Sequence, residues 1–204
     1  MEWKAEKGGL MIVGVLALQG DFAEHKALFS SLGVETREVR LSSQLESLAA
    51  LVIPGGESTT IGKLAVTYDL IEPLRKFGSA HPIWGTCAGA IFLSKDAQRN
   101  QPLLGLMDIR VERNAFGRQV DSFEIELTVS KLADPERPFP AVFIRAPLIE
   151  HAGSKVAILA RLPAEKGEGK IVAAREGQFL ATSFHPELTG DERFHRYFID
   201  MIRG

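Results

Sequence analysis

The residue with the clearest chemical potential is Cys87, the only cysteine in this chain of 204 residues. It lies in Gly85-Thr86-Cys87-Ala88-Gly89, between an apolar run typical of a buried strand and a run typical of a helix. A Gly-x-Cys-x-Gly turn in this position predicts a sharp elbow that holds the thiol over the end of a sheet. Backbone N–H groups at the start of the helix would favour the thiolate, so Cys87 is a candidate nucleophile.

The alternative for Cys87 is an inert core position, which is the commoner fate of a lone cysteine in an apolar stretch. The glycines two positions away on either side favour the nucleophile. A free thiol with a pKa of about 8.5 is only slightly ionised at neutral pH, so it would also need a base.

The best candidate for that base is His185, which ends an apolar, β-rich run and is followed by Pro186 and Glu187. Proline biases the residue before it toward an extended conformation, and residues two apart on an extended chain point to the same side. We therefore expect the carboxylate of Glu187 to orient the imidazole of His185, as in a nucleophile, base and orienter triad. The alternative is a strand that simply ends in solvent.

The other histidines lack such neighbours. Two of them fall within amphipathic helical patterns, which predict partly exposed surface positions. The four are His25, His81, His151 and His195, of which His25 and His195 are the helical ones.

A third candidate segment is Pro54-Gly55-Gly56-Glu57-Ser58-Thr59-Thr60, which follows a short apolar strand. Two glycines would let the backbone approach a ligand, and its N–H groups could stabilise an oxyanion. The alternative is an ordinary loop between a strand and a helix, capped by Ser58 or Thr59.

Taken together and in this chain order, the three segments resemble the class I, triad-type glutamine amidotransferases. The local spelling is most similar to the glutaminase subunits of pyridoxal phosphate synthase, and the resemblance covers nearly the whole chain from about Met11. One departure is Ile91, where many class I domains carry a glutamine four residues after the cysteine. The segments that carry the resemblance are Leu18–Asp21, Pro54–Thr60, Gly85–Gly89, Val111–Phe123, Phe143–Pro147 and Ser183–Thr189.

The resemblance implies hydrolysis of L-glutamine to glutamate and ammonia by Cys87, His185 and Glu187 through a thioester. It also implies substrate-binding residues, an oxyanion site formed near Gly56 and Ala88, and no cofactor or metal. Gln19, in the loop after the first strand, is expected to take part in activation by a partner. The residues implied to bind the substrate are Gly55, Gly56, Glu57, Arg113, Ile144 and Arg145.

The implied partner is the larger synthase subunit, a (β/α)8 barrel that combines the ammonia with two sugar phosphates to make pyridoxal phosphate. Three other functions stay open on the residues alone. They are an amidotransferase subunit that serves another acceptor, a cysteine peptidase or γ-glutamyl hydrolase, and a non-catalytic subunit.

Composition excludes several other classes of protein. With 45% hydrophobic residues the chain can bury a full core, and its net charge of −2 offers no basic stripe for nucleic acid. The longest apolar run, Leu10 to Leu18, is far shorter than the roughly 20 residues that span a bilayer. A single reactive cysteine suits a reducing compartment, so we expect a cytoplasmic protein.

The order of apolar runs predicts one α/β domain over residues 11–204, after a polar N-terminal extension over residues 1–10. The resemblance implies a three-layer, flavodoxin-like fold with a mostly parallel central sheet and an antiparallel addition in the second half. Asp21 and Glu24 predict a capping box for the first helix. We expect strands over residues 11–18, 34–39, 50–53, 123–129, 141–144, 156–162, 170–174 and 179–184, helices over 61–66 and 70–77, and a last helix with Phe194, Phe198, Met201 and Ile202 on one face.

Overall fold

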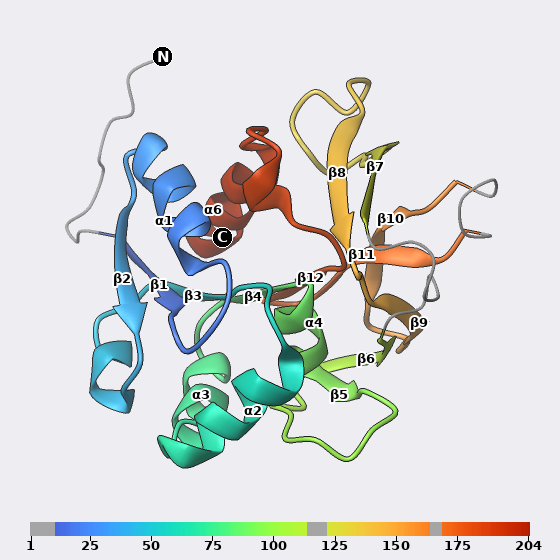
Figure 1. Cartoon of the computed structure of the whole chain (residues 1–204). Coiled ribbons are helices and arrows are strands. Elements are labelled where there is room, and N and C mark those ends of the chain that lie inside the picture. Colours follow the sequence, from blue (N-terminus) through green and yellow to red (C-terminus); the bar gives the residue numbers. More distant parts are fainter. Residues whose placement is uncertain (1–10, 114–121, 164–168) are drawn as a thin grey trace.

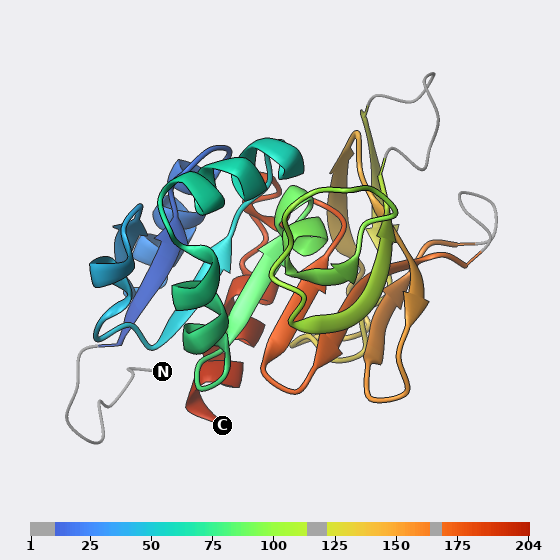
Figure 2. The same cartoon turned by 90° about the horizontal axis from the view of Figure 1, so that it is seen from below.

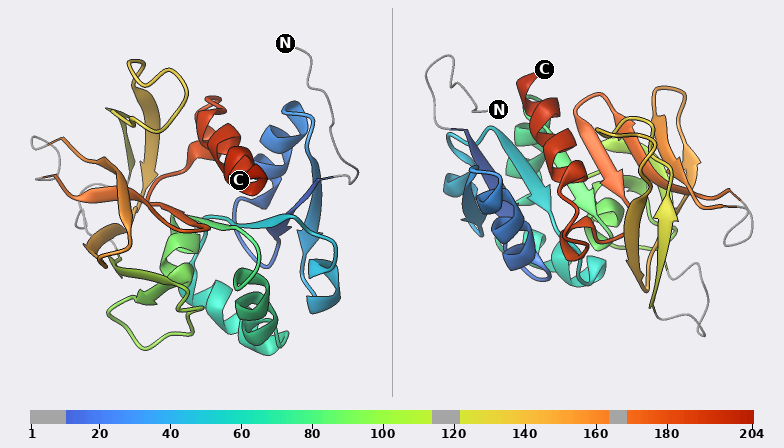
Figure 3. Two further views of the ribbon diagram at one scale, coloured as in Figure 1. Left: turned by 180° about the vertical axis from the view of Figure 1, so that it is seen from behind. Right: turned by 90° about the horizontal axis from the view of Figure 1, so that it is seen from above.

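One curled sheet runs through the centre of the molecule, with helices on both of its faces (Figure 1). In the computed structural model, which describes residues 11–113, 122–163 and 169–204, ten strands form this sheet. Their order is β2-β1-β3-β4-β12-β11-β9-β6-β5, with β10 paired to β11. Helices α1 and α6 lie side by side on one face, and α2, α3 and α4 cover the other (Figures 1 and 3). The predicted three-layer α/β fold is confirmed.

The observed helices and strands follow the predicted runs closely. The sequence analysis did not predict three of the strands, which are β5, β6 and β9. The strands are β1 (Ile12–Leu16), β2 (Glu35–Val39), β3 (Ala50–Ile53), β4 (Ile83–Thr86), β5 (Ser94–Asp96), β6 (Met107–Glu112), β7 (Ser122–Leu127), β8 (Phe139–Ile144), β9 (Leu148–Ala152), β10 (Ala157–Arg161), β11 (Ile171–Glu176) and β12 (Phe179–Thr182). The helices are α1 (Phe22–Ser31), α2 (Ser58–Thr67), α3 (Ile71–Gly78), α4 (Ala88–Leu93) and α6 (Arg193–Arg203), with short 3₁₀ helices η1 (Ser42–Leu45) and η2 (Pro186–Leu188). The expected extension over residues 1–10 lies outside the described residues.

Five neighbouring strands, β2, β1, β3, β4 and β12, are mutually parallel. Their carboxyl ends therefore meet at one edge of the sheet, which is where open α/β sheets bind ligands. The loops after β1, β3, β4 and β12 carry Gln19, Gly55, Cys87 and His185, so the topology gathers all three predicted segments and Gln19 at that edge.

Alternation along each parallel strand builds a core on both faces. In β3, Ala50 and Val52 join the cluster that contains Trp84, while Leu51 and Ile53 join the cluster on the opposite face. Successive side chains of a strand point to opposite faces, so a strand covered on both sides must be apolar throughout. This explains why β3 appears in the sequence as an unbroken apolar run. The last helix confirms its predicted apolar face, with Phe194 and Phe198 buried and Met201 and Ile202 partly buried.

The second half of the chain is largely antiparallel. Strand β11 pairs antiparallel with β12, β9 and β10, and β6 pairs antiparallel with β9. Strands β7 and β8 form a separate two-stranded ribbon, and Figure 2 shows these later strands beside the parallel half. Because β8 ends at Ile144, it delivers Ile144 and Arg145 to the edge where Cys87 lies.

Candidate active site

Cys87 occupies a strained turn between β4 and α4, with φ of 48° and ψ of −109°. Its backbone N–H donates to the carbonyl of Thr182 over 2.8 Å, which fixes the turn against β12. A Cβ atom at Gly89 would overlap the carbonyl oxygen of Ile53, so only glycine lets α4 approach β3 this closely. The predicted elbow is present, and positive φ at a non-glycine residue is a kind of strain that clusters at functional sites.

The imidazole of His185 lies between Cys87 and Glu187. Its Nδ1 is 2.7 Å from Oε1 of Glu187, and the backbone N–H of His185 donates to the carbonyl of Val142 over 2.8 Å. Burial lowers the pKa of His185, but hydrogen bonds to Cys87 and Glu187 outweigh burial and raise it to about 10. The imidazolium is therefore the favoured state at neutral pH, opposite a partner that can carry negative charge.

The expectation of an extended His-Pro-Glu segment is wrong. Pro186 opens the 3₁₀ helix η2, with His185 as its N-cap residue, because the fixed φ of proline suits the first position of a helix. This tight turn, and not an extended strand, places the carboxylate of Glu187 against the imidazole of His185. The side chain of Glu187 is fully buried, and burial raises its pKa while the hydrogen bond with His185 opposes that rise.

Asp21 belongs to the site, although the sequence suggested a helix cap. It is the N-cap residue of α1 but its side chain makes no capping hydrogen bond, so the expected capping box is wrong. Its Oδ2 lies 3.4 Å from Nδ1 of His185. The position of Asp21 directly after the Gln19-Gly20 turn, at the carboxyl edge of β1, was the signal that could have identified it.

The loop after β3 is organised by Glu57. Its carboxylate accepts hydrogen bonds from the backbone N–H groups of Thr59 and Thr60, so Glu57, and not Ser58 or Thr59, caps α2. Oε1 of Glu57 is also 2.6 Å from Nη2 of Arg113. Burial raises the pKa of Glu57, but the bonds from Thr60, Thr59 and Arg113 outweigh it and lower the pKa to about 2.

A cavity of about 570 Å³ opens over Cys87. Most of the residues predicted for the site line it, whereas Glu187 is buried behind His185 and Gly55 packs beneath the imidazole. The carbonyl of Ile144 lies 4.0 Å from Sγ of Cys87. The predicted residues that line the cavity are Gln19, Gly56, Glu57, Cys87, Ala88, Arg113, Ile144, Arg145 and His185, joined by Asp21, Ser58, Ile91, Ser122 and Pro147.

The expectation that His25 and His195 are partly exposed is wrong. His25 and His195 are both fully buried, with Nδ1 of His25 3.0 Å from Nε2 of His195. Nε2 of His25 lies 3.2 Å from the hydroxyl of Thr86 and 3.3 Å from Oε2 of Glu187. The amphipathic patterns of α1 and α6 predicted a buried face for each helix. They could not predict that the two buried faces contact each other.

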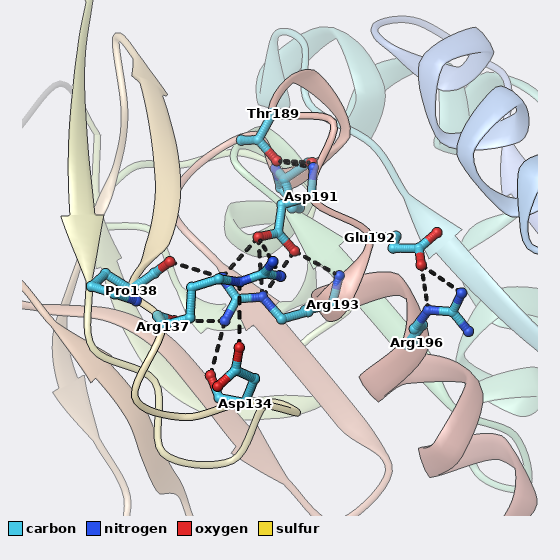
Figure 4. A network of polar contacts seen from close by, with 9 residues as sticks. Asp134, Arg137, Pro138, Thr189, Asp191, Glu192, Arg193 and Arg196 are labelled. Carbon is cyan, nitrogen blue, oxygen red and sulfur yellow. Dashed lines mark hydrogen bonds and ion pairs between the residues drawn. The ribbon is translucent and has the colours of Figure 1, made fainter.

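The segment that follows Glu187 is held by Arg193 (Figure 4). This buried guanidinium bonds the carboxylate of Asp191 and the carbonyls of Asp134, Arg137 and Pro138, over distances of 2.6 to 3.2 Å. It thereby ties the start of α6 to the loop before β8, the strand that carries Ile144.

Asp21, His185 and Glu187 are close enough to hold a metal ion, since one ligand atom from each lies within 4.8 Å of the others. The hydrogen bond between Nδ1 of His185 and Glu187 already accounts for their arrangement.

The comparison with protein families decides the class. The pattern of the SNO glutamine amidotransferase family matches residues 15–204. The chain belongs to this family. It is therefore an enzyme of the glutamine amidotransferase class, and the resemblance seen in the sequence is confirmed.

Several curated relatives of this amidotransferase carry the same name. "Pyridoxal 5'-phosphate synthase subunit PdxT" of Herpetosiphon aurantiacus is 57% identical, over 94% of this chain and 100% of its own length. The protein of the same name from Pelotomaculum thermopropionicum is 58% identical, over 93% of this chain and 94% of its own.

Solved structures agree. A crystal structure of a glutamine amidotransferase is 50% identical and superposes with a TM-score of 0.86, covering 94% of this chain and 99% of its own. PurLQS from Thermotoga maritima, at 14% identity and a TM-score of 0.65 over 95% and 99% of the two chains, shares the fold. No helix in the described parts of this amidotransferase is long and apolar enough to cross a membrane.

Proposed function

We propose that this amidotransferase hydrolyses L-glutamine through a Cys87, His185 and Glu187 triad and supplies the ammonia to a pyridoxal phosphate synthase. The observation that carries the proposal is the continuous contact from Cys87 through His185, which both line the cavity, to Glu187, which is buried behind them. The first two groups provide nucleophile and proton carrier, and the third provides the orienting charge. The names of the curated relatives support the pathway.

In the first half of the reaction, His185 takes the proton of Cys87, and the sulfur attacks the side-chain carbonyl carbon of glutamine. An S–C bond forms, and the N–H groups of Gly56 and Ala88 stabilise the oxyanion, which is worth about 3 kcal/mol for each well-placed donor. The C–N bond then breaks as His185 gives its proton to the leaving nitrogen, and ammonia departs. The raised pKa of His185 suits a group that must hold this proton until then.

In the second half, water attacks the γ-glutamyl thioester with His185 as base, the S–C bond breaks, and glutamate is released. Glu57 and Arg113 present adjacent opposite charges at the cavity wall, which complement the α-amino and α-carboxylate groups of the substrate. We propose that Gly55, Gly56, Ile144 and Arg145 complete the binding site. The requirement for a free thiol suits the cytoplasm.

The test uses the chain together with the synthase barrel subunit from the same organism. The wild-type complex should make pyridoxal phosphate from the two sugar phosphates when either glutamine or an ammonium salt supplies nitrogen. With Cys87→Ala in the complex, the ammonium reaction should continue while the glutamine reaction stops. Glutamine turnover by Cys87→Ala within tenfold of wild type would contradict the covalent mechanism, and failure of the wild-type complex to use glutamine would contradict the pathway.

A further inference from the structure

A chain of buried polar side chains continues behind the triad, through Glu187 to His25 on α1 and His195 on α6. Glu187, His25 and His195 are all inaccessible to solvent. Oε1 of Glu187 is bonded to His185, but Oε2 has no hydrogen bond of good geometry within the described residues. The ring nitrogen that faces Oε2 is Nε2 of His25, 3.3 Å away.

The surroundings of His25 decide which of its nitrogens carries the proton. Nε2 faces the hydroxyl of Thr86 at 3.2 Å and Oε2 of Glu187 at 3.3 Å; the hydroxyl can donate or accept a hydrogen bond, whereas the carboxylate can only accept one. A lone pair on Nε2 would therefore oppose the lone pairs of Glu187, whereas a proton there is attracted to them. His25 must then accept at Nδ1, from Nε2–H of His195, 3.0 Å away.

His195 supports the same assignment independently. Its Nδ1 is buried and has no partner among the residues that the structure describes. If His25 donated from Nδ1, the proton of His195 would have to reside on this isolated nitrogen, and buried N–H groups without an acceptor are rarer than unpaired acceptors. Both rings are thus neutral with the proton on Nε2, and the donors point in one direction, from His195 to His25 to Glu187.

We propose that His25 is a positioning residue for glutamine hydrolysis: its Nε2–H, which also contacts the hydroxyl of Thr86, attracts Oε2 of Glu187 at 3.3 Å and so helps to fix the carboxylate that orients His185. This inference rests on the proposed function of the triad. His195 contributes indirectly. By donating from Nε2 to Nδ1 of His25, it keeps the proton of His25 on Nε2. Two parts of the fold contribute to this arrangement, because α1 and α6 supply the histidines from one face of the sheet and the loop after β12 supplies His185 and Glu187.

The charges around Glu187 explain why a neutral donor suits this position. Glu187 faces His185 on its own segment, His25 on α1 and Asp21 in the loop after β1. Burial and the repulsion of Asp21 both raise the pKa of Glu187. Burial, and then the neighbouring His195 and His185, lower the pKa of His25 well below its usual value, so His25 can present its N–H to Glu187 without competing for the proton of the triad.

The first experiment compares His25→Leu, which removes the donor, with His25→Gln, which keeps an N–H near the position of Nε2. The control is Phe29→Leu, the other buried residue of α1, which packs on His195 but leaves the donors intact. We expect His25→Leu to lower kcat about tenfold or more with KM nearly unchanged, and to move the acid limb of the pH–rate profile upward. His25→Gln should recover most of kcat. If His25→Leu and Phe29→Leu have the same kcat and pH profile, the proposal is wrong.

The second experiment does not depend on activity. Nitrogen-15 NMR of the histidine rings in full-length Cys87→Ala at pH 7 should show His25 and His195 as neutral rings, each with its proton on Nε2. A proton on Nδ1 of His25, or a charged His25, would overturn the proposal. A wild-type complex that fails to use glutamine while the NMR shows the expected tautomers would instead reject the proposed function and leave the hydrogen-bond chain in place.

Discussion

Oε1 of Gln19 accepts a hydrogen bond from the backbone N–H of Glu57 over 2.6 Å, and this bond joins the loop after β1 to the loop after β3. The resemblance implied a role in activation for Gln19, and its side chain bonds the loop after β3 and not the first turn of α1. It fixes the glycine backbone at Gly56, where we propose an oxyanion donor. A partner that moves the loop after β1 can thus also move the loop after β3.

We predict that Gln19→Ala loses most of the stimulation of glutamine hydrolysis by the synthase barrel subunit, because the glycine loop is no longer held in one arrangement. Cys87 should remain open to alkylation in this variant. The measurement is the rate of glutamate release with and without saturating barrel subunit, with Gln19→Glu, which keeps the acceptor, as the matched control. Equal wild-type rates in the two conditions would rule out gating.

We predict that His185→Asn nearly abolishes turnover, whereas Glu187→Gln is milder and moves the alkaline limb of the pH–rate profile to lower pH. Removing a carboxylate beside His185 takes away a charge that favours the imidazolium, so its pKa should fall from about 10 by on the order of one unit or more. The base is still present in Glu187→Gln, which explains the milder loss. A limb that does not move, or a larger defect in Glu187→Gln than in His185→Asn, would require the roles to be reassigned.

We predict that the chain loses stability as the pH falls below about 6.5, because the buried His25 and His195 must stay neutral to fold. Burial lowers the pKa of His195 to about 3 and that of His25 well below its usual value, while both have ordinary values in the unfolded chain. For these two groups the unfolded state therefore binds more protons in this window, and each should cost about 1.4 kcal/mol between pH 7.5 and 5.5, while His185, whose pKa is raised to about 10, offsets about 1.4 kcal/mol over the same interval. Urea unfolding at the two pH values measures the loss. His195→Gln, which can still donate to His25, should lose about 1.4 kcal/mol less than the wild-type chain over this interval.

We predict that Gly20→Ala destabilises the protein by at least about 3 kcal/mol and lowers activity, whereas Gly33→Ala costs only about 1–2 kcal/mol. Both glycines have positive φ, so alanine is strained at either position. At Gly20, a Cβ atom would also overlap the carbonyl of Gly55 and force apart the two loops that meet at His185, while the space around Gly33 is open. Urea unfolding separates backbone strain from steric overlap, and equal losses would show that the close approach of the loops is not important.

We predict that Arg193→Met lowers the free energy of unfolding by about 3–5 kcal/mol, since it leaves the carboxylate of Asp191 and several carbonyls without their buried partner. The matched control is Arg196→Met on the same helix, which breaks an exposed pair with Glu192 and should cost about 1 kcal/mol or less (Figure 4). Chemical denaturation of the two variants side by side provides the measurement. Comparable losses would mean that Arg193 does not hold the segment after η2.

The sequence alone determined the features that depend on local chain geometry. The glycines on either side of Cys87 predict its elbow because only they permit so sharp a bend, and the apolar run before each functional loop predicts a buried parallel strand. Parallel strands end at one edge, so the meeting of Cys87, His185 and the Gly55-Gly56 loop also followed from the sequence. What only the tertiary structure decided are the contacts between elements. Periodicity gives the buried face of α1 and of α6 but not the partner of each face, so the burial of His25 against His195 and Glu187 could not be derived from it. In the same way, the side chain of Asp21 had two possible partners, the end of its own helix and a histidine far along the chain, and the packing of the β1 and β12 loops brings it to the histidine.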